Sequence, residues 1–249
     1  MEITSTELEG IKLYRLTNED EKHNGFQYHD GLNVDTEPFN PVGDCEPGGL
    51  YFFCEESLHT FPQNVNMDTI EWIREVTLLP DSRIYKMKDK FKTDKFFLGP
   101  RSNFGDFLES NPKIWLAAVQ QDEWALHYVK KQTSEICLAA VQQNGYILRY
   151  VKEQTPDICL AAVQQNGYAL EYVKKQTYEI CLAAVKQNGY ALEYVEKQTS
   201  EICLAAVQQN GLALRFVKEQ TPNICLAAVQ QNGYALHYVK KENTRNLFW

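Results

Sequence analysis

The sequence lacks any hydrophobic run long enough to cross a bilayer. No apolar stretch approaches the roughly 18 residues that a transmembrane helix needs, and the first ten residues, MEITSTELEG, lack the basic and apolar blocks of a secretory signal. Hydrophobic residues make up 44% of the chain, which is ordinary for soluble globular proteins. We therefore expect a cytoplasmic protein that does not bind membranes.

Concentrated positive charge is also missing. Residues 1–110 carry 21 acidic and 11 basic side chains, which leaves 12 acidic and 14 basic side chains for residues 111–249. Neither part has the clustered Lys and Arg that bind phosphate backbones, so we expect no nucleic-acid partner. The difference in charge balance indicates two domains of different kinds.

Motifs for metals, cofactors and catalysis are absent as well. The sequence has no CxxC or HxxxH pair, and the Gly48-Gly49 pair precedes an expected strand instead of opening a helix, which is wrong for a phosphate-binding loop. A zinc site or a Cys and His pair for nucleophilic catalysis is conceivable, but the spacing is poor and no third orienting group can be named. The residues concerned are His23, His29, Cys45, Cys54 and His59. We expect no metal, no cofactor and no catalytic residues.

What the sequence has in abundance is one 22-residue unit in six consecutive copies. The copies start at residues 111, 133, 155, 177, 199 and 221, and we number them repeat 1 to repeat 6. A fixed short period is typical of solenoids, in which a single repeat cannot bury its apolar face and stacks on its neighbours. We predict an α-helical solenoid of six helix-turn-helix repeats over residues 111–242, followed by a cap or tail over 243–249.

Repeat 3, TPDICLAAVQQNGYALEYVKKQ, shows the pattern of a helical hairpin. Thr155, Pro156 and Asp157 supply an N-cap, a proline for the first helical position and a carboxylate for the positive end of the helix dipole. Asn166-Gly167 predicts a left-handed close of the first helix, and the amphipathic segment 168–176 predicts a second α-helix. We expect twelve helices of about nine or ten residues each, similar to a shortened tetratricopeptide-type hairpin.

Five of the seven cysteines recur at one position of successive repeats. Stacked helices lie about 8–10 Å apart, whereas a disulfide needs Cα atoms within about 7 Å, and Trp115 stands at the same position of repeat 1. We expect buried thiols without a redox role. The residues are Cys137, Cys159, Cys181, Cys203 and Cys225.

One exposed position of the expected second helix varies in charge along the array. The residues at this position are His127, Arg149, Glu171, Glu193, Arg215 and His237. The charge changes sign twice, as it does on a surface matched to one partner, so partner binding by this row is our hypothesis. The alternative is that these side chains are merely solvated. We assign the glutamine pairs, such as Gln164-Gln165, to an amide ladder between repeats, and the tyrosines at position 14 of the repeat, such as Tyr168, to the core.

The two ends of the array depart from the pattern. Asp122-Glu123 replaces Asn-Gly in repeat 1, and we expect Trp115 and Trp124 to pack against the N-terminal domain. The apolar tail residues 247–249 either fold back over repeat 6 or drive association, so we expect a monomer or a weak dimer through the C-terminal tail.

Residues 1–110 show no repeat and are expected to form a small α+β domain. Turn signals separate the segments 12–16, 26–28, 49–53, 72–79 and 83–87, which have the composition of strands. Asn111-Pro112 marks the boundary and opens the first helix of the array.

Three stretches of this domain carry a family resemblance. The segments LYRLTNEDEKHNGFQYHDGLN, CEPGGLYFF and WIREVTLLP resemble the amino-terminal module that precedes repeat arrays in proteins of giant viruses of the mimivirus family. In that family the module commonly precedes ankyrin repeats, whereas the array here resembles a different short helical repeat of unknown function. The resemblance implies a viral protein acting in the host cytoplasm, and it brings no assigned catalytic residues.

The function expected from these patterns is a non-enzymatic protein–protein interaction scaffold that binds a host or viral protein through the solenoid surface. The alternative is a small transferase of the ADP-ribosyl-transferring type in the N-terminal domain, with Tyr14, Arg15 and His23 in its site and the repeats recruiting substrate. No catalytic glutamate can be assigned for it. An adaptor for ubiquitin ligases fits the two-domain layout, but the sequence has no recognisable box for it.

Overall fold

The computed structural model describes residues 1–41, 46–60 and 69–240, and the chain divides into two compact units. The N-terminal unit is Met1–Ala118 and the C-terminal unit is Val119–Trp249, so the division falls within helix α3 (Pro112–Gln121). Helix α3 begins at Pro112, as the sequence predicted. The expected domain boundary at 110/111 stays a prediction, and the expected cap or tail, 243–249, lies outside the described residues.

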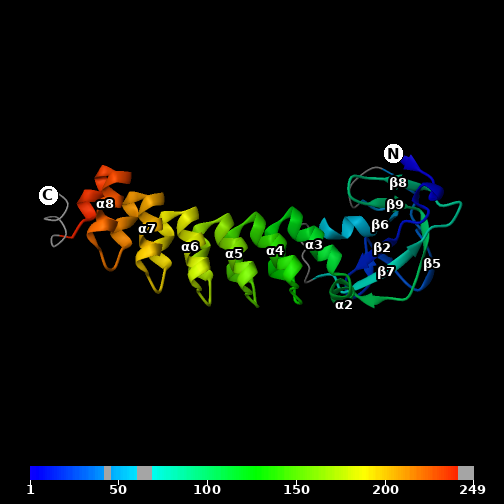
Figure 1. The fold of residues 1–249 in the computed structure, drawn as a ribbon. Helices are drawn as coiled ribbons and strands as arrows, with labels where there is room; N and C mark the ends of the chain where they lie inside the picture. The colour runs from blue at the N-terminus through cyan, green and yellow to red at the C-terminus, as the bar shows by residue number, and fades with distance from the viewer. Residues whose placement is uncertain (42–45, 61–68, 241–249) are drawn as a thin grey trace. The chain divides into compact units, whose positions relative to one another are not determined.

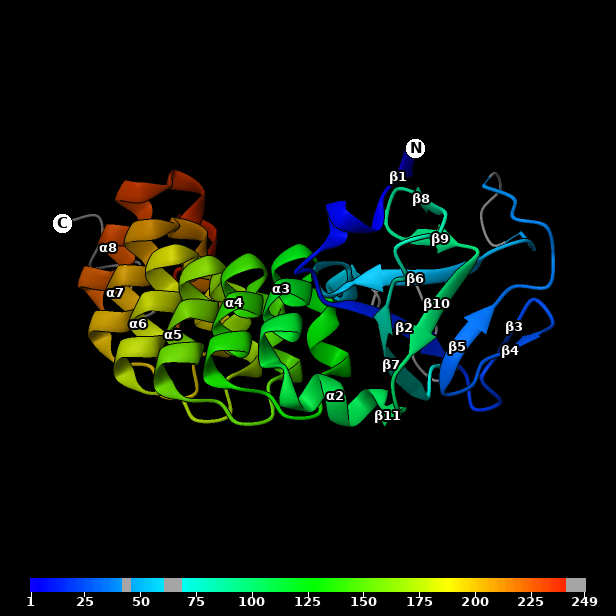
Figure 2. The same ribbon diagram turned by 90° about the vertical axis from the view of Figure 1, so that its right-hand side faces the viewer.

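An antiparallel sheet forms the N-terminal unit (Figure 2). In the described residues its order is β1-β8-β9-β6-β2-β7-β10-β5, with β11 paired to β7, and β3 and β4 form a separate hairpin. The strands are β1 (Glu2–Ile3), β2 (Leu13–Thr17), β3 (Lys22–His23), β4 (Phe26–Gln27), β5 (Gly31–Val34), β6 (Leu50–Cys54), β7 (Trp72–Thr77), β8 (Ile84–Lys86), β9 (Phe91–Thr93), β10 (Lys95–Leu98) and β11 (Ser102–Asn103). The short helices are η1 (Ser5–Leu8), η2 (Glu55–Thr60) and α2 (Phe104–Ser110), where η denotes a 3-10 helix.

The five predicted strands of this unit are confirmed as β2, β4, β6, β7 and β8. Sequence reasoning missed β1, β3, β5, β9, β10 and β11, each of which has only two to four residues. Lys92 on β9 is fully buried, because its ammonium donates to the backbone carbonyls of Glu46 and Pro47. Apolar side chains from η1, β2, β6, β7, β8, β9 and β10 build one core, in which Phe52 stacks on Phe91 with ring centroids 5.1 Å apart.

The C-terminal unit is the predicted helical solenoid (Figure 1). Each repeat has one α-helix of ten residues; after α3 these are α4 (Ser134–Gln143), α5 (Pro156–Gln165), α6 (Tyr178–Gln187), α7 (Ser200–Gln209) and α8 (Pro222–Gln231). The prediction of a second α-helix is wrong, since this segment is a six-residue 3-10 helix in every repeat. These helices are η4 (Glu123–Tyr128), η5 (Gly145–Tyr150), η6 (Gly167–Tyr172), η7 (Gly189–Tyr194), η8 (Gly211–Phe216) and η9 (Gly233–Tyr238).

Contacts with the preceding repeat explain why η6 stays short. The Val173 amide donates to the Leu170 carbonyl at 3.2 Å, the i to i+3 bond of a 3-10 helix. The next amide, Lys174, would need the same carbonyl to continue as an α-helix, but it donates to Oε1 of Gln154 at 2.9 Å. The Tyr172 carbonyl accepts a bond from Nε2 of the same glutamine. A side chain from repeat 2 therefore ends the second helix of repeat 3.

The Asn-Gly turn also differs from its prediction. Asn166 has extended backbone, with φ −149°, and its side chain accepts a hydrogen bond from the Tyr168 amide, so it caps η6 instead of closing α5 in a left-handed conformation. Gly167 is absent from the positive-φ residues. A Cβ at this position would lie 2.5 Å from the carbonyl oxygen of Ala184 in the next repeat. Glycine is required here because the backbones of adjacent repeats touch.

The start of each α-helix follows the predicted capping pattern. The Thr155 side chain accepts a hydrogen bond from the Ile158 amide, and Pro156 occupies the first turn of α5. The five repeat cysteines are buried and unpaired, as expected. Burial raises the pKa of the Cys137 thiol to about 11, and burial with a smaller contribution from Glu196 raises the pKa of Cys181 to about 11. No helix in the described residues is long and apolar enough to span a membrane.

Candidate functional site

The row proposed from the sequence lies on one edge of the solenoid. Each of its residues is the fifth residue of a 3-10 helix from η4 to η9, and each side chain is exposed. We call this set the charged row; it comprises His127, Arg149, Glu171, Glu193, Arg215 and His237. Because all six occupy the same position of a repeated element, they follow one another along the same edge.

Half-exposed aromatic side chains surround the charged row. In four successive pairs, an aromatic ring at position 14 of one repeat meets the ring at position 18 of the next, edge to face, at centroid distances of 5.7–6.2 Å. We call these pairs the aromatic ladder. They are Trp124–Tyr150, Tyr146–Tyr172, Tyr168–Tyr194 and Tyr190–Phe216. Such edge-to-face pairs are individually worth about 0.5–1.5 kcal/mol beyond burial.

Sequence reasoning missed this ladder because it assigned the position-14 tyrosines to the core. That assignment is wrong for Tyr146 and Tyr234, which are 37% and 74% exposed. Leu212 at the same position had indicated simple packing, whereas the other repeats present an aromatic ring. Trp124, for which we expected packing against the N-terminal domain, lies against Tyr150 of repeat 2 and is 45% exposed.

The two arginines of the charged row lie over the aromatic ladder. The Arg149 guanidinium is 4.7 Å from the Tyr150 centroid and 5.4 Å from Trp124, and Arg215 lies 4.5 Å from Phe216 and 4.8 Å from Tyr190. A cation over an aromatic face is held by the ring quadrupole. These contacts fix the two positive charges on either side of the two central carboxylates.

The central part of the row is acidic. Burial, followed by the nearby carboxylates of Glu171 and Glu193, raises the pKa of Tyr194 above its ordinary value. His127 at the first end of the row lies edge-on to Tyr150 at 5.4 Å. The charge order along the edge is thus imidazole, cation, two carboxylates, cation and imidazole.

Glutamine side chains tie each repeat to the next and hold this surface in place. Oε1 of Gln165 accepts the Gly145 amide at 2.7 Å, and its Nε2 donates to the Gln143 carbonyl at 2.9 Å. At the opposite edge Gln154 receives the Lys174 amide and donates to the Tyr172 carbonyl. The amides therefore bond to main-chain groups of neighbouring repeats, not to one another as expected from the sequence. The charged row stands on a pre-ordered backbone.

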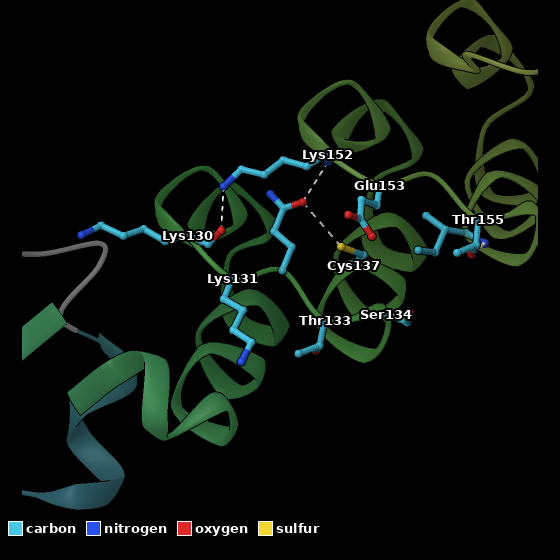
Figure 3. Close-up of a pocket in the computed structure, with 10 residues that line it drawn as sticks. Lys130, Lys131, Thr133, Ser134, Cys137, Lys152, Glu153 and Thr155 are labelled. Carbon is cyan, nitrogen blue, oxygen red and sulfur yellow. Dashed lines mark hydrogen bonds between the residues drawn. The ribbon is translucent and has the colours of Figure 1, made fainter. Parts of the chain in front are cut away.

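Two corresponding cavities open between repeats on the edge opposite to the glycine turns. One has a volume of about 270 Å³ and is lined by residues from Lys130 to Ile158 (Figure 3), and the other, of about 380 Å³, is lined by the equivalent residues from Lys174 to Ile202. A cysteine, Cys137 or Cys181, lines each. The raised pKa of both thiols keeps them protonated near neutral pH, so they are weak nucleophiles.

Of the residues named for the alternative transferase, Arg15 and His23 both contact Tyr51, whereas Tyr14 lies on the other face of the sheet from Arg15. Tyr14 and Arg15 are adjacent on β2, so their side chains point to opposite faces of the sheet. The Tyr14 hydroxyl donates to Glu55 at 3.5 Å. Arg15 is buried, donates to the Tyr51 carbonyl at 3.0 Å and lies over the Tyr28 ring at 4.4 Å. These contacts give Arg15 a packing role in the sheet.

Histidine and cysteine side chains of the N-terminal unit do not gather into a ligand set in the part that the structure describes. Cys54 lies 3.0 Å from the Ser57 hydroxyl, and His23 lies edge-on to Tyr51 at 5.6 Å. Cys45 lies outside the described residues. Burial, with a smaller contribution from Arg15, lowers the pKa of His23 to about 4.

A family match covers the array. The profile of the family described as "Domain of unknown function (DUF4116)" matches residues 111–155, 133–177, 155–198, 177–221 and 199–243, which together exceed half of the chain. The chain belongs to this family. Each match spans two consecutive repeats, so the DUF4116 sequence pattern covers a pair of the 22-residue repeats described above.

Relatives of this DUF4116 protein come from Acanthamoeba polyphaga mimivirus. It is 36% identical over 103 residues to "Putative ankyrin repeat protein R868", covering 38% of this chain and 49% of that protein. It is 34% identical over 113 residues to "Putative ankyrin repeat protein R896", covering 43% and 32%, and 48% identical over 54 residues to "Uncharacterized protein R869", covering 20% and 39%. No solved structure matches the chain.

These matches confirm the resemblance to mimivirus repeat proteins. The chain spans about half or less of the length of these relatives. The word ankyrin in two of their names describes a repeat of about 33 residues, whereas the array here has a 22-residue period and one α-helix per repeat.

Proposed function

We propose that this protein is a non-enzymatic scaffold that binds a host or viral protein through the charged row and the aromatic ladder. The observation that carries the proposal is the position of Arg149 and Arg215 over half-exposed aromatic rings. Trp, Tyr and Arg are the residues that most often dominate protein–protein binding energy. The relatives named as ankyrin repeat proteins support a role in protein binding.

The charge order selects the partner. Two cations flank two carboxylates along the row, so a complementary surface has basic groups at its centre and acidic groups on both sides. The glutamine bonds between repeats hold the surface in its binding conformation before contact, so little conformational entropy is lost on binding. The proposed location is the cytoplasm of the host cell.

A pair of four-site variants tests this proposal. The row variant changes Arg149, Glu171, Glu193 and Arg215 to Gln, which removes the charges at similar size. The control variant changes Lys130, Lys131, Glu153 and Glu219 to Gln; all four are exposed, and the set carries the same number of charges of each sign. Both proteins serve as bait in infected-cell lysate, with captured proteins quantified by mass spectrometry and melting temperatures measured.

We expect the row variant to lose at least tenfold of one captured protein that the wild type and the control variant retain. Its melting temperature should fall only slightly, because each lost cation–aromatic contact is worth about 0.5–1 kcal/mol at an exposed site. Equal capture by all three baits would remove the charged row from consideration.

A further inference from the structure

Lysine side chains close four of the five junctions between repeats on the edge opposite to the glycine turns. At each of these junctions, a lysine at position 20 of one repeat donates from its ammonium to the main-chain carbonyl at position 20 of the preceding repeat. In three of the four junctions it also donates to the carbonyl at position 19, and all the distances lie between 2.7 and 3.4 Å. The donors are Lys152, Lys174, Lys218 and Lys240. The Lys152 ammonium lies 2.7 Å from the Lys130 carbonyl oxygen, and a dashed line marks this hydrogen bond in Figure 3.

The remaining junction, between repeats 3 and 4, lacks this ammonium because position 20 of repeat 4 is Glu196. The backbone there is the same as elsewhere, since the Glu196 amide donates to Gln176 at 3.0 Å just as the Lys174 amide donates to Gln154. Within the described residues, neither the Val173 nor the Lys174 carbonyl accepts a side-chain ammonium. The structure therefore shows no lysine ammonium on these two carbonyl oxygens in the described residues, and Glu196 occupies the position from which a lysine supplies it at the other junctions.

The larger of the two corresponding cavities lies at this junction. The cavity that Glu196 lines has a volume of about 380 Å³, and the cavity that Lys152 lines has a volume of about 270 Å³. Glu196 and Cys181 both line this cavity, and after burial the Glu196 carboxylate is the second cause of the raised pKa of Cys181. Two lysines, Lys175 and Lys197, also line the cavity and donate to neither carbonyl.

We propose that the Glu196 junction binds one alkylammonium group, the side chain of a lysine from a partner protein, on the Val173 and Lys174 carbonyls and the Glu196 carboxylate. The chain itself shows the fit, because it places its own lysine ammonium on the equivalent carbonyls four times. This site is separate from the charged row and does not rest on the proposed function.

The test titrates Nα-acetyl-lysine methylamide into the full-length ¹⁵N-labelled protein and follows the amide resonances by NMR. We expect saturable shifts at Val173, Lys174 and Glu196, and none with Nα-acetyl-norleucine methylamide, which lacks the ammonium. Glu196→Lys supplies the missing ammonium from the chain itself. This variant should raise the dissociation constant of the lysine probe at least tenfold, and its melting temperature should be unchanged or higher. Glu196→Gln keeps the side-chain size and should weaken binding at least threefold.

A further variant tests whether the same site can be created at another junction. Lys152→Glu should create new shifts at Val129 and Lys130 with the same probe, because it recreates the Glu196 arrangement at an earlier junction. Unchanged binding by Glu196→Lys, or equal shifts with the norleucine probe, would refute the proposal. Saturable shifts at this junction with calcium chloride, without a response to the lysine probe, would identify a metal site and refute the ammonium assignment.

Discussion

At the scale of single residues, the N-terminal unit buries several ionisable groups against carboxylate, backbone and aromatic partners. Arg74 is 3% exposed and forms ion pairs with Glu21 and Asp30. Lys92 is paired with backbone carbonyls. His23 differs from these, because burial, with smaller contributions from the nearby cations Arg15, Lys90 and Lys92, lowers its pKa to about 4. The fold therefore holds His23 in its neutral form.

This state of His23 predicts a pH dependence of stability. Its pKa is about 6.5 in the unfolded chain and about 4 in the folded one, so the unfolded chain binds the proton more tightly. The stability that His23 contributes is present above pH 6.5 and is lost as the pH falls towards 4. His23→Phe keeps an aromatic ring against Tyr51 and removes this titration.

Urea-dependent hydrogen exchange of β6 amides, measured at pH 7 and pH 4.5, gives the free energy of opening for both proteins. We expect the wild type to lose more stability than His23→Phe between these two values. An identical loss in the two proteins would show that carboxylates alone cause the acid sensitivity.

At the scale of the element, the 3-10 helix in each of repeats 2 to 5 is bounded by contacts with both neighbouring repeats. Its start is fixed by an asparagine cap and by a glycine whose α-carbon touches the next repeat, and its end is fixed by a glutamine from the preceding repeat. The six residues between are too few to bury an amphipathic face, so their aromatic rings remain half-exposed in the ladder.

Two glycine variants test the contact between repeats. Gly167→Ala places a Cβ 2.5 Å from the Ala184 carbonyl oxygen, whereas Gly233→Ala in the last repeat meets nothing within 4 Å. We expect Gly167→Ala to destabilise the array by about 1–3 kcal/mol through overpacking, and Gly233→Ala to be neutral or stabilising by about 0.4–1 kcal/mol. Urea unfolding followed by circular dichroism measures both, and similar effects of the two variants would contradict the role given to the close contact.

The sequence predicted the elements that local chemistry determines. Helix α5 begins after Thr155 because its cap and its first-turn proline lie within three residues of each other. The sequence did not predict the 3-10 helices. Helix η6 ends because the Lys174 amide donates to the side chain of Gln154, which lies twenty positions earlier in the chain. The charged row was found from its variation between repeats, whereas the aromatic ladder and the Glu196 junction depend on contacts between repeats that no single repeat reveals.

At the scale of the whole molecule, the array is a chain of equivalent junctions. Glycine, glutamine and lysine each form bonds or contacts at a fixed offset to an adjacent repeat. Stability is therefore expected to add up from repeat to repeat through nearest-neighbour contacts. The number of residues between equivalent positions therefore has to stay constant for these glycine and glutamine contacts to form.

Deletion variants test this additivity. Removing residues 155–176 deletes the whole of repeat 3 and joins Gln154 to Thr177, the first residue of repeat 4. Every remaining junction keeps its register. This protein should fold with a lower melting temperature, because one junction is lost. Removing only residues 155–165 deletes α5 but leaves η6 without a partner, and it should abolish cooperative unfolding of the array. Circular dichroism melts compare the two, and equal melting temperatures would argue against register as the controlling factor.

The fixed offset of the glutamine bonds has a genetic consequence. Unequal recombination between two of the near-identical copies adds or removes whole repeats, and each product again places every glutamine opposite the amide it needs. The array can thus gain or lose one repeat at a time, and we expect the protein to fold at every step. The exposed edge can therefore become longer or shorter by gene duplication alone, and a single copy can still differ from the others, as repeat 4 does with Glu196 where the other five repeats have lysine.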